Sequence, residues 1–213
     1  MVVPAVLAGC GGGGGKTVSS SSLHPRLLPS IAGLRFERSF DWRDPVDLVG
    51  QGIAIPQATA PSRAVKEFQD AGYRGAAGVA FTPRGQPEPE TIEAVAQLRS
   101  SADARTVLTW LHGQDLQQPC FSQCIFQPRS IAIRGVPGAE GVAQVPGQQP
   151  LPPGARKLPS GAASGGPQTN LIAEFTIGPY LYYARTQADR REQPRFVAGV
   201  KLAYTRAKRY ASS

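Results

Sequence analysis

The sequence is poor in the groups that enzymes most often use. It has two histidines and three cysteines in 213 residues, and it contains neither a GxSxG nucleophile elbow nor an HExxH zinc motif. Its cysteines offer no second pair for a structural zinc site. No window approaches the roughly 18 apolar residues that a membrane-spanning helix needs. We therefore expect a protein that is not an enzyme, with no cofactor and no metal site, and we exclude a polytopic membrane protein.

Acidic residues are also scarce relative to basic ones. Aspartate and glutamate number 15 against 23 lysines and arginines, which gives a net charge of +8. Most of this excess falls near the C-terminus, and a basic surface favours anionic partners such as nucleic acids, acidic polymers or lipid headgroups. A plain solvated basic face is the alternative interpretation. The side chains that we expect to contact an anionic surface are Arg190, Arg191, Arg195, Lys201, Arg206, Lys208 and Arg209.

Glycine and proline are abundant, with 24 and 20 residues, and they concentrate in residues 10–22 and 136–169. Stretches of this composition bury too little apolar surface to offset the entropy that a chain loses on ordering. We therefore expect residues 136–169 to be a disordered insertion within a single domain, which residues 34–135 and 170–213 form together.

Hydrophobic periodicity predicts the elements of this domain. Helices are expected over residues 61–71, 88–100, 102–112 and 194–210. Strands are expected over residues 73–81, 130–136, 170–177 and 180–185, the last two joined as a hairpin at Gly178-Pro179. Glu88, Glu90 and Glu93 are assigned to the first turns of the second helix, where the helix dipole favours acidic groups. The predicted fold class is α+β, with one antiparallel or mixed sheet packed against helices.

The N-terminus carries the most specific motif. Leu7-Ala8-Gly9-Cys10 follows a short apolar run and resembles the lipobox of bacterial lipoproteins, in which small residues precede a cysteine. The resemblance implies a diacylglyceryl group on Cys10, and two acyl chains anchor a protein stably to a membrane. We interpret residues 1–9 as a truncated signal peptide hydrophobic region, and residues 10–33 as a lipidated, disordered Gly/Ser-rich tether.

The two remaining cysteines, Cys120 and Cys124, are an even number and lie close together in the sequence. We expect them to form a disulfide that closes a small loop, as is typical of exported proteins. Two alternatives remain open: unpaired structural cysteines, or a metal or nucleophile site that includes His112.

The segment FTIGPYLYYAR, residues 175–185, followed by a terminal helix resembles the end of small α/β domains in actinobacterial envelope lipoproteins of unassigned activity. Together the two resemblances imply a lipid-anchored binding or scaffolding module on the extracytoplasmic face of the cell membrane. Its partners would be the membrane and an anionic lipid or cell-wall polymer. One alternative is a cytoplasmic nucleic-acid-binding protein that stacks bases on Tyr180, Tyr182 and Tyr183; another is an envelope enzyme without a recognisable motif. We expect no nucleic acid.

Overall fold

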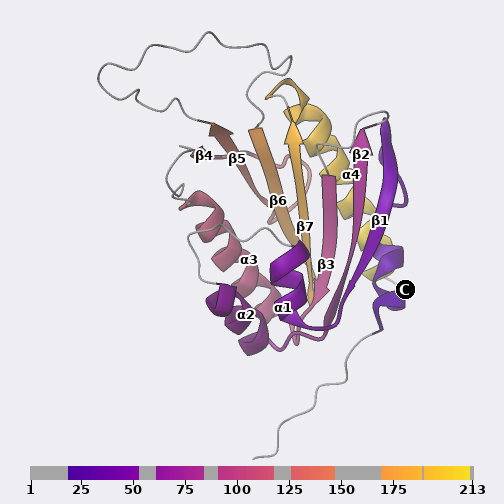
Figure 1. Cartoon of the computed structure of the whole chain (residues 1–213), viewed down its shortest axis with the longest axis vertical. Helices are drawn as coiled ribbons and strands as arrows, with labels where there is room; N and C mark the ends of the chain where they lie inside the picture. The colour runs from indigo at the N-terminus through magenta and orange to yellow at the C-terminus, as the bar shows by residue number, and fades with distance from the viewer. Residues whose placement is uncertain are drawn as a thin grey trace, which may run out of the picture.

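The computed structural model describes residues 19–52, 61–83, 91–117, 126–146, 169–188 and 190–211, and Figure 1 shows their arrangement. The strands are β1 (Leu34–Trp42), β2 (Gly75–Pro83), β3 (Thr91–Gln97), β4 (Phe126–Ser130), β5 (Glu140–Pro146), β6 (Thr169–Ile177) and β7 (Tyr180–Ala188). The helices are α1 (Pro45–Asp47), α2 (Pro61–Asp70), α3 (Ser101–Leu116) and α4 (Gln193–Ala211). Shorter helical turns are η1 (Ser20–Ser22), η2 (His24–Arg26), η3 (Leu48–Gly52) and η4 (Arg190–Glu192).

The strands form one seven-stranded sheet in the order β1-β2-β3-β7-β6-β5-β4, and every neighbouring pair is antiparallel. The predicted hairpin is confirmed. Its strands β6 and β7 pair from Thr169↔Ala188 to Ile177↔Tyr180, so that Gly178 and Pro179 form the turn. Gly178 has a φ of 57°, a conformation that glycine adopts without steric cost. The hairpin lies inside the sheet and connects its two halves.

The predicted fold class, α+β with one antiparallel or mixed sheet packed against helices, is wrong. The described residues form a sheet-rich fold in which an open, wholly antiparallel sheet of seven strands is accompanied by four helices. The helix expected over residues 88–100 is the central strand β3, and every residue from Ile92 to Ala96 is buried. A strand that is covered on both faces loses the alternating pattern by which strands are recognised.

The middle of the chain also differs from expectation. The strand expected over residues 130–136 lies earlier, as β4, and it is followed by turns at Gly135 and Gly138. Within residues 136–169, which we expected to be disordered, Glu140–Pro146 forms strand β5 and pairs with β6. The ordered part of the domain therefore includes residues that composition alone assigned to the insertion.

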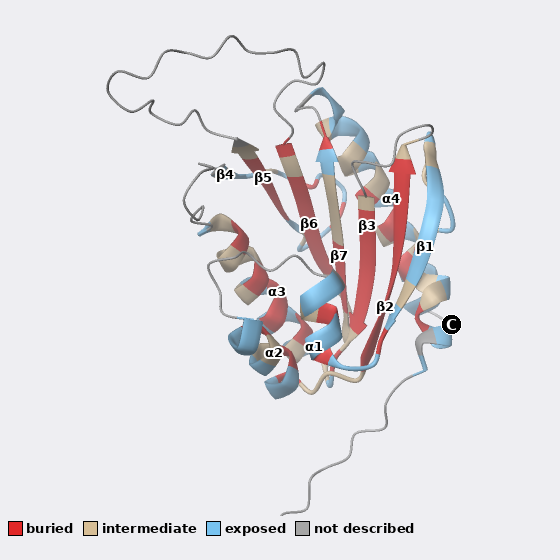
Figure 2. Ribbon diagram, viewed as in Figure 1, coloured by how far each residue is buried: buried red, intermediate tan, exposed pale blue. Residues whose placement is uncertain are grey.

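Two apolar cores cover the two faces of the sheet. On one face, α2 and α3 pack through Phe68, Val107 and Leu111. On the other face, α4 packs through Val200 and Ala203. Figure 2 shows the buried central strands between these layers. Tyr182 and Tyr183 are neighbours in β7 and are buried in opposite cores, so neither side chain is available to stack a nucleic-acid base.

Residues 19–33 lie within the range that we expected to be a tether, and the structure describes them. Leu23 and Leu27 are buried in the core beneath α4. Arg206 Nε of α4 donates a hydrogen bond to the carbonyl oxygen of Pro25 at 2.9 Å, and Arg195 donates one to the carbonyl oxygen of Ala32. His24 Nε2 lies 2.7 Å from Asp41 Oδ1 on β1. Residues 23–33, here called the N-terminal strap, are therefore part of the folded body.

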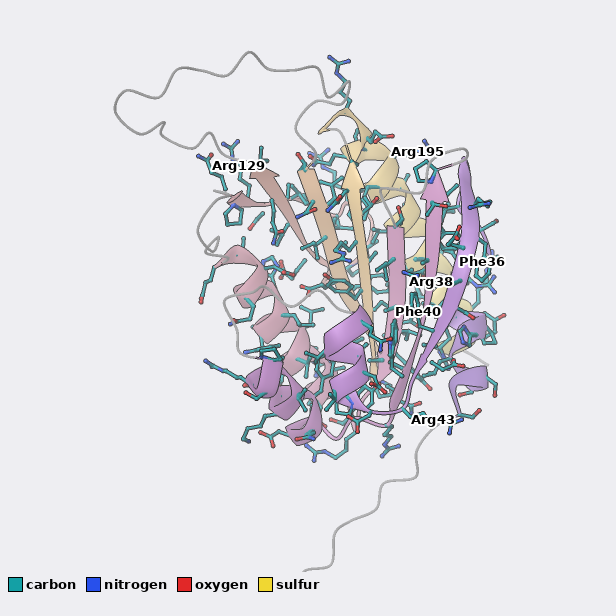
Figure 3. All side chains as sticks on the ribbon, in the orientation of Figure 1. Phe36, Arg38, Phe40, Arg43, Arg129 and Arg195 are labelled. Atoms are coloured by element: carbon teal, nitrogen blue, oxygen red, sulfur yellow. The ribbon has the colours of Figure 1, made fainter. Side chains whose placement is uncertain are left out.

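Edge strand β1 carries charged side chains and an irregularity in its pairing. The register with β2 shifts between Phe36 and Arg38. Arg38 lies over the ring of Phe40 at 5.1 Å, and Phe40 stacks on Trp42 at a centroid distance of 5.0 Å. Figure 3 labels Phe36, Arg38 and Phe40 on this strand. Charges and bulges on an edge strand discourage pairing with other chains.

The indole ring of Trp42 depends on a glycine in the neighbouring strand. A Cβ atom on Gly78 would lie 2.6 Å from Cζ3 of Trp42 and 3.2 Å from the carbonyl oxygen of Glu93. We expect Gly78→Ala to lower the free energy of unfolding by about 1–3 kcal/mol, because the buried ring must move. Chemical denaturation measures this change. Gly113→Ala in α3 is the matched control, since nothing lies within 4 Å of its Cβ position, and equal stabilities of the two variants would contradict the prediction.

Candidate functional site

Helix α3 carries the residues of the candidate site on its buried face. The hydroxyl oxygen of Ser100 caps its first turn by accepting a hydrogen bond from the backbone N–H of Asp103 at 3.2 Å. The helix was expected to end at His112, but it continues to Leu116. This extra turn places Asp115 against the sheet, four residues after the buried Leu111.

Three neighbouring strands present polar residues to this helix in a single row. Glu174 of β6 pairs with Glu140 of β5 on one side and with Tyr183 of β7 on the other. His112 of α3 lies above this row, with Nε2 at 3.5 Å from Glu140 Oε2 and Nδ1 at 4.0 Å from Glu174 Oε2. We name these residues the acidic cluster: His112, Asp115, Glu140, Glu174 and Tyr183.

The innermost members of the acidic cluster are almost completely buried. Asp115, Glu174 and Tyr183 are each 1% exposed. Both carboxylate oxygens of Asp115, both of Glu174, the hydroxyl of Tyr183 and Nδ1 of His112 have no hydrogen-bond partner among the described residues. Gln144 donates to the backbone carbonyl of Asp115 at 3.3 Å and leaves its carboxylate unpaired. Buried polar groups in native proteins nearly always have partners, so this arrangement requires an explanation.

Burial changes the protonation of these groups. It raises the pKa of Asp115 from 3.8 to about 8, against the opposing influence of the positive charge of Arg185. The pKa of Glu174 is raised well above its usual value by burial first and then by the charges of Asp115 and Glu140. Asp115 also lies in the last turn of α3, where the helix dipole disfavours a carboxylate. Both shifts favour the protonated forms of this pair, whereas ordinary carboxyl groups are ionised at neutral pH.

The acidic cluster is not arranged as a metal site. Within the described ranges, no group of three or more His, Cys, Asp or Glu side chains is placed to hold a metal ion. The cluster instead offers six polar atoms without hydrogen-bond partners among the described residues, and four of them are carboxylate oxygens. Chemically, it suits a proton or a ligand that brings hydrogen-bond donors.

A second buried acid lies on the opposite face of the sheet. Glu93, which we assigned to the start of a helix, is in the middle of β3, and its Oε2 accepts a hydrogen bond from the backbone N–H of Leu28 at 3.0 Å. Burial raises the pKa of Glu93 to about 7, while this hydrogen bond and the charge of Arg206 act in the opposite direction. Oε2 thus fastens the N-terminal strap, while Oε1 has no hydrogen-bond partner among the described residues.

Of the residues singled out from the sequence, His112 belongs to the acidic cluster. Cys10, Cys120 and Cys124 fall outside the described residues. The seven basic residues belong to η4 and α4, on the other face of the sheet. The side chain of Arg190 lies outside the part of the chain that the structure describes. Figure 3 labels Arg195, which, like Arg206, fastens the N-terminal strap.

The remaining basic side chains of the predicted set lie on the outer surface. Arg191, Lys201, Lys208 and Arg209 are exposed. Lys208 lies 5.7 Å from the ring centroid of Tyr204. On α4 the exposed Leu202 lies next to Lys201.

Sequence reasoning missed the acidic cluster, although one signal was present. Glu174 interrupts the apolar run of β6 at a position whose neighbours, Ala173 and Phe175, are both buried. A charged residue within such a strand has no solvent to face. No comparable signal pointed to Asp115, because helix α3 was expected to end before it.

No helix in the described part of the chain is long and apolar enough to cross a membrane. No protein-family model matches the chain, and no curated protein matches it in sequence. Among solved structures, the chain is similar to the crystal structure of the extracellular domain of PknH from Mycobacterium tuberculosis, with a TM-score of 0.56 and 11% identity. The match covers 93% of this chain and 99% of that domain. At this identity the likeness shows a shared fold alone.

Proposed function

We propose that this chain is an extracytoplasmic binding module of the cell envelope, held at the membrane through Cys10, and that the acidic cluster is its ligand-binding site. The fold is that of an extracellular domain over nearly its whole length, and the lipobox supplies the route to the same compartment. The observation that carries the binding role is the pair of buried carboxyl groups that have no hydrogen-bond partner among the described residues.

The free-energy cost of that pair supports a binding role. Two carboxyl groups buried side by side are unfavourable when charged, because desolvation and mutual repulsion act together. Neutral side chains of the same size would fill the space at a lower cost. Proteins keep such unfavourable arrangements mainly at sites where function needs them, and strongly perturbed pKa values gather there.

We also propose that the outer surface of α4 faces an anionic lipid or cell-wall polymer. Lys201, Lys208 and Arg209 are exposed on this helix, and so is Leu202, which is 63% exposed. A helix that exposes basic residues together with an apolar side chain suits the headgroup region of an anionic membrane. This surface is on the opposite side of the sheet from the acidic cluster, so one face would meet the envelope while the other binds the ligand.

The binding role can be tested without knowing the ligand. We expect at least one class in a panel of small amines, amino acids, sugars and carboxylates to raise the melting temperature of the wild-type protein, since a ligand that binds only the folded state stabilises it. Glu174→Gln should abolish this rise, and Glu192→Gln, which alters an exposed acid of η4, should preserve it. If every compound changes the melting temperatures of the wild-type protein, Glu174→Gln and Glu192→Gln equally, the proposal is contradicted.

The lipid anchor has a separate test. When residues 10–213 are expressed behind a complete lipoprotein signal peptide in an actinobacterial host, we expect the chain to enter the detergent phase after phase separation. Cys10→Ala should move it to the aqueous phase, because the acyl chains supply the membrane affinity. Equal partitioning of the two forms would show that Cys10 is not the anchor.

A further inference from the structure

Building on the binding role of the acidic cluster, we propose that its ligand presents a primary ammonium group to Asp115 and Glu174. The inference concerns only the chemical class of the ligand, and it rests on which hydrogen-bonding groups of the cluster lack partners.

The unpaired groups require a ligand that donates hydrogen bonds. The four carboxylate oxygens of Asp115 and Glu174 are acceptors when ionised, and none of them has a donor among the described side chains. The nearby amide of Gln144 already donates to a backbone carbonyl. An ammonium group carries three donors and no acceptor, so it complements these oxygens without leaving an unpaired acceptor of its own.

The balance of charge selects a cation. Asp115 and Glu174 bring two negative charges into the buried part of the cluster when both are ionised, and Arg185 is the basic side chain whose charge acts on Asp115. His112 Nδ1 lies 4.0 Å from Glu174 Oε2, so one negative charge is left without compensation while its imidazole is neutral. A singly charged ammonium group neutralises it, whereas an anion would add to the repulsion.

Exposure in the cluster increases from the interior to the surface, which gives the displaced carboxyl proton a route to water. The side chain of Glu140 is 48% exposed, that of His112 is 16% exposed, and that of Glu174 is 1% exposed. His112 lies between the two glutamates, at 3.5 Å from one and 4.0 Å from the other. When the ammonium group binds, the carboxyl proton that it displaces passes from Glu174 through His112 and Glu140 to water.

Isothermal titration calorimetry of the purified 213-residue chain tests the inference with three probes: n-butylammonium, tetramethylammonium and butyrate. We expect n-butylammonium to bind at least about tenfold more tightly than tetramethylammonium, which has the same charge but no N–H donor, because charge-assisted hydrogen bonds are lost. Glu174→Gln should weaken n-butylammonium binding about tenfold or more, and Glu192→Gln should leave it unchanged. Titrations in two buffers of different ionisation enthalpy should show proton release on binding.

The outcomes separate the ligand class from the binding role. If tetramethylammonium binds as tightly as n-butylammonium, or if n-butylammonium binds equally to Glu174→Gln, the ammonium inference is overturned. If butyrate or an uncharged compound of the panel binds in a Glu174-dependent way instead, the site binds a ligand of another class, and the proposed function stands. If no probe and no compound of the panel depends on Glu174, both proposals fail.

Discussion

Replacing Asp115 with Asn and Glu174 with Gln in one variant is expected to raise the free energy of unfolding by about 2–4 kcal/mol at pH 8 and by much less at pH 5. The two neutral side chains keep the size of the originals and remove the buried charges. Each unit by which folding raises the pKa of an acid costs about 1.4 kcal/mol at a pH above both values. The pKa of Asp115 rises from 3.8 to about 8, and the unpaired amides of the variant offset part of the gain.

The free energy of unfolding of the wild-type protein is expected to change with pH in one direction. Because the pKa of Asp115 is higher in the folded state than in the unfolded state, the folded protein binds more protons between these two values. The stability of the wild-type protein therefore falls as the pH rises from about 4 toward 8. The raised pKa of Glu174 acts in the same direction. Urea denaturation at a series of pH values measures this slope, which the double variant should flatten.

A matched control uses two acids on the outer side of α2, the half-buried Glu67 and the exposed Asp70. Glu67 and Asp70 form i,i+4 ion pairs with Arg63 and Lys66 at the surface. We expect Glu67→Gln with Asp70→Asn to change the stability by only about 0.5–1 kcal/mol, and in the unfavourable direction, because exposed pairs contribute little. A double variant of the acidic cluster that behaves like this control would show that the buried carboxyl groups carry no free-energy cost.

Shortening Leu27 is expected to have a comparably large effect of opposite sign. Leu27 is 1% exposed and belongs to the N-terminal strap, where it packs in the core beneath α4. We expect Leu27→Ala to lower the free energy of unfolding by about 2–5 kcal/mol, the usual range for a fully buried leucine. Guanidinium denaturation measures the loss. The same change in the exposed Leu202 should stay within about 0.5 kcal/mol.

This prediction distinguishes the strap from a tether. A flexible tether would tolerate Leu27→Ala without loss, since its side chains bury no surface. If Leu27→Ala and Leu202→Ala are equally stable, the folded body does not include residues 23–33. A loss confined to Leu27→Ala would show that the folded body includes residues 23–33.

The elements with strong local signals could be predicted from the sequence. Helix α2 begins with a proline and buries Ala64 and Phe68 on one face, and such a pattern is typical of an amphipathic helix. The β6–β7 hairpin combines two apolar runs with a Gly-Pro turn. In α4 the buried residues Val200, Ala203 and Ala207 follow helical spacing. In each case local sequence and tertiary packing favour the same structure.

Strands β3 and β5 could not be predicted because their structure is set by distant partners. The apolar residues of β3 match helical spacing as well as a buried strand, and its place between β2 and β7 decides the outcome. Strand β5 lies in a region whose average composition indicates disorder, yet it pairs along its length with β6. Composition averaged over a long window does not reveal a short strand that forms by pairing with an edge of the β6–β7 hairpin.

The acidic cluster depends on the same long-range pairing. Glu140, Glu174 and Tyr183 become neighbours only through the register of β5, β6 and β7. Asp115 joins them only because α3 continues past Gly113. The sequence shows a charged residue, Glu174, within the apolar run of β6. The residues that join it to form the acidic cluster could be identified only from the tertiary structure.

The protonation of Asp115 and Glu174 can be observed directly by carbon-detected NMR titration of the side-chain carboxyl groups. The structure predicts that both carboxyl resonances titrate far above the ordinary range, with Asp115 near pH 8, and that the two transitions influence each other. Titration of both groups near pH 4, like exposed carboxyl groups, would contradict the buried, unpartnered site on which the proposed function rests.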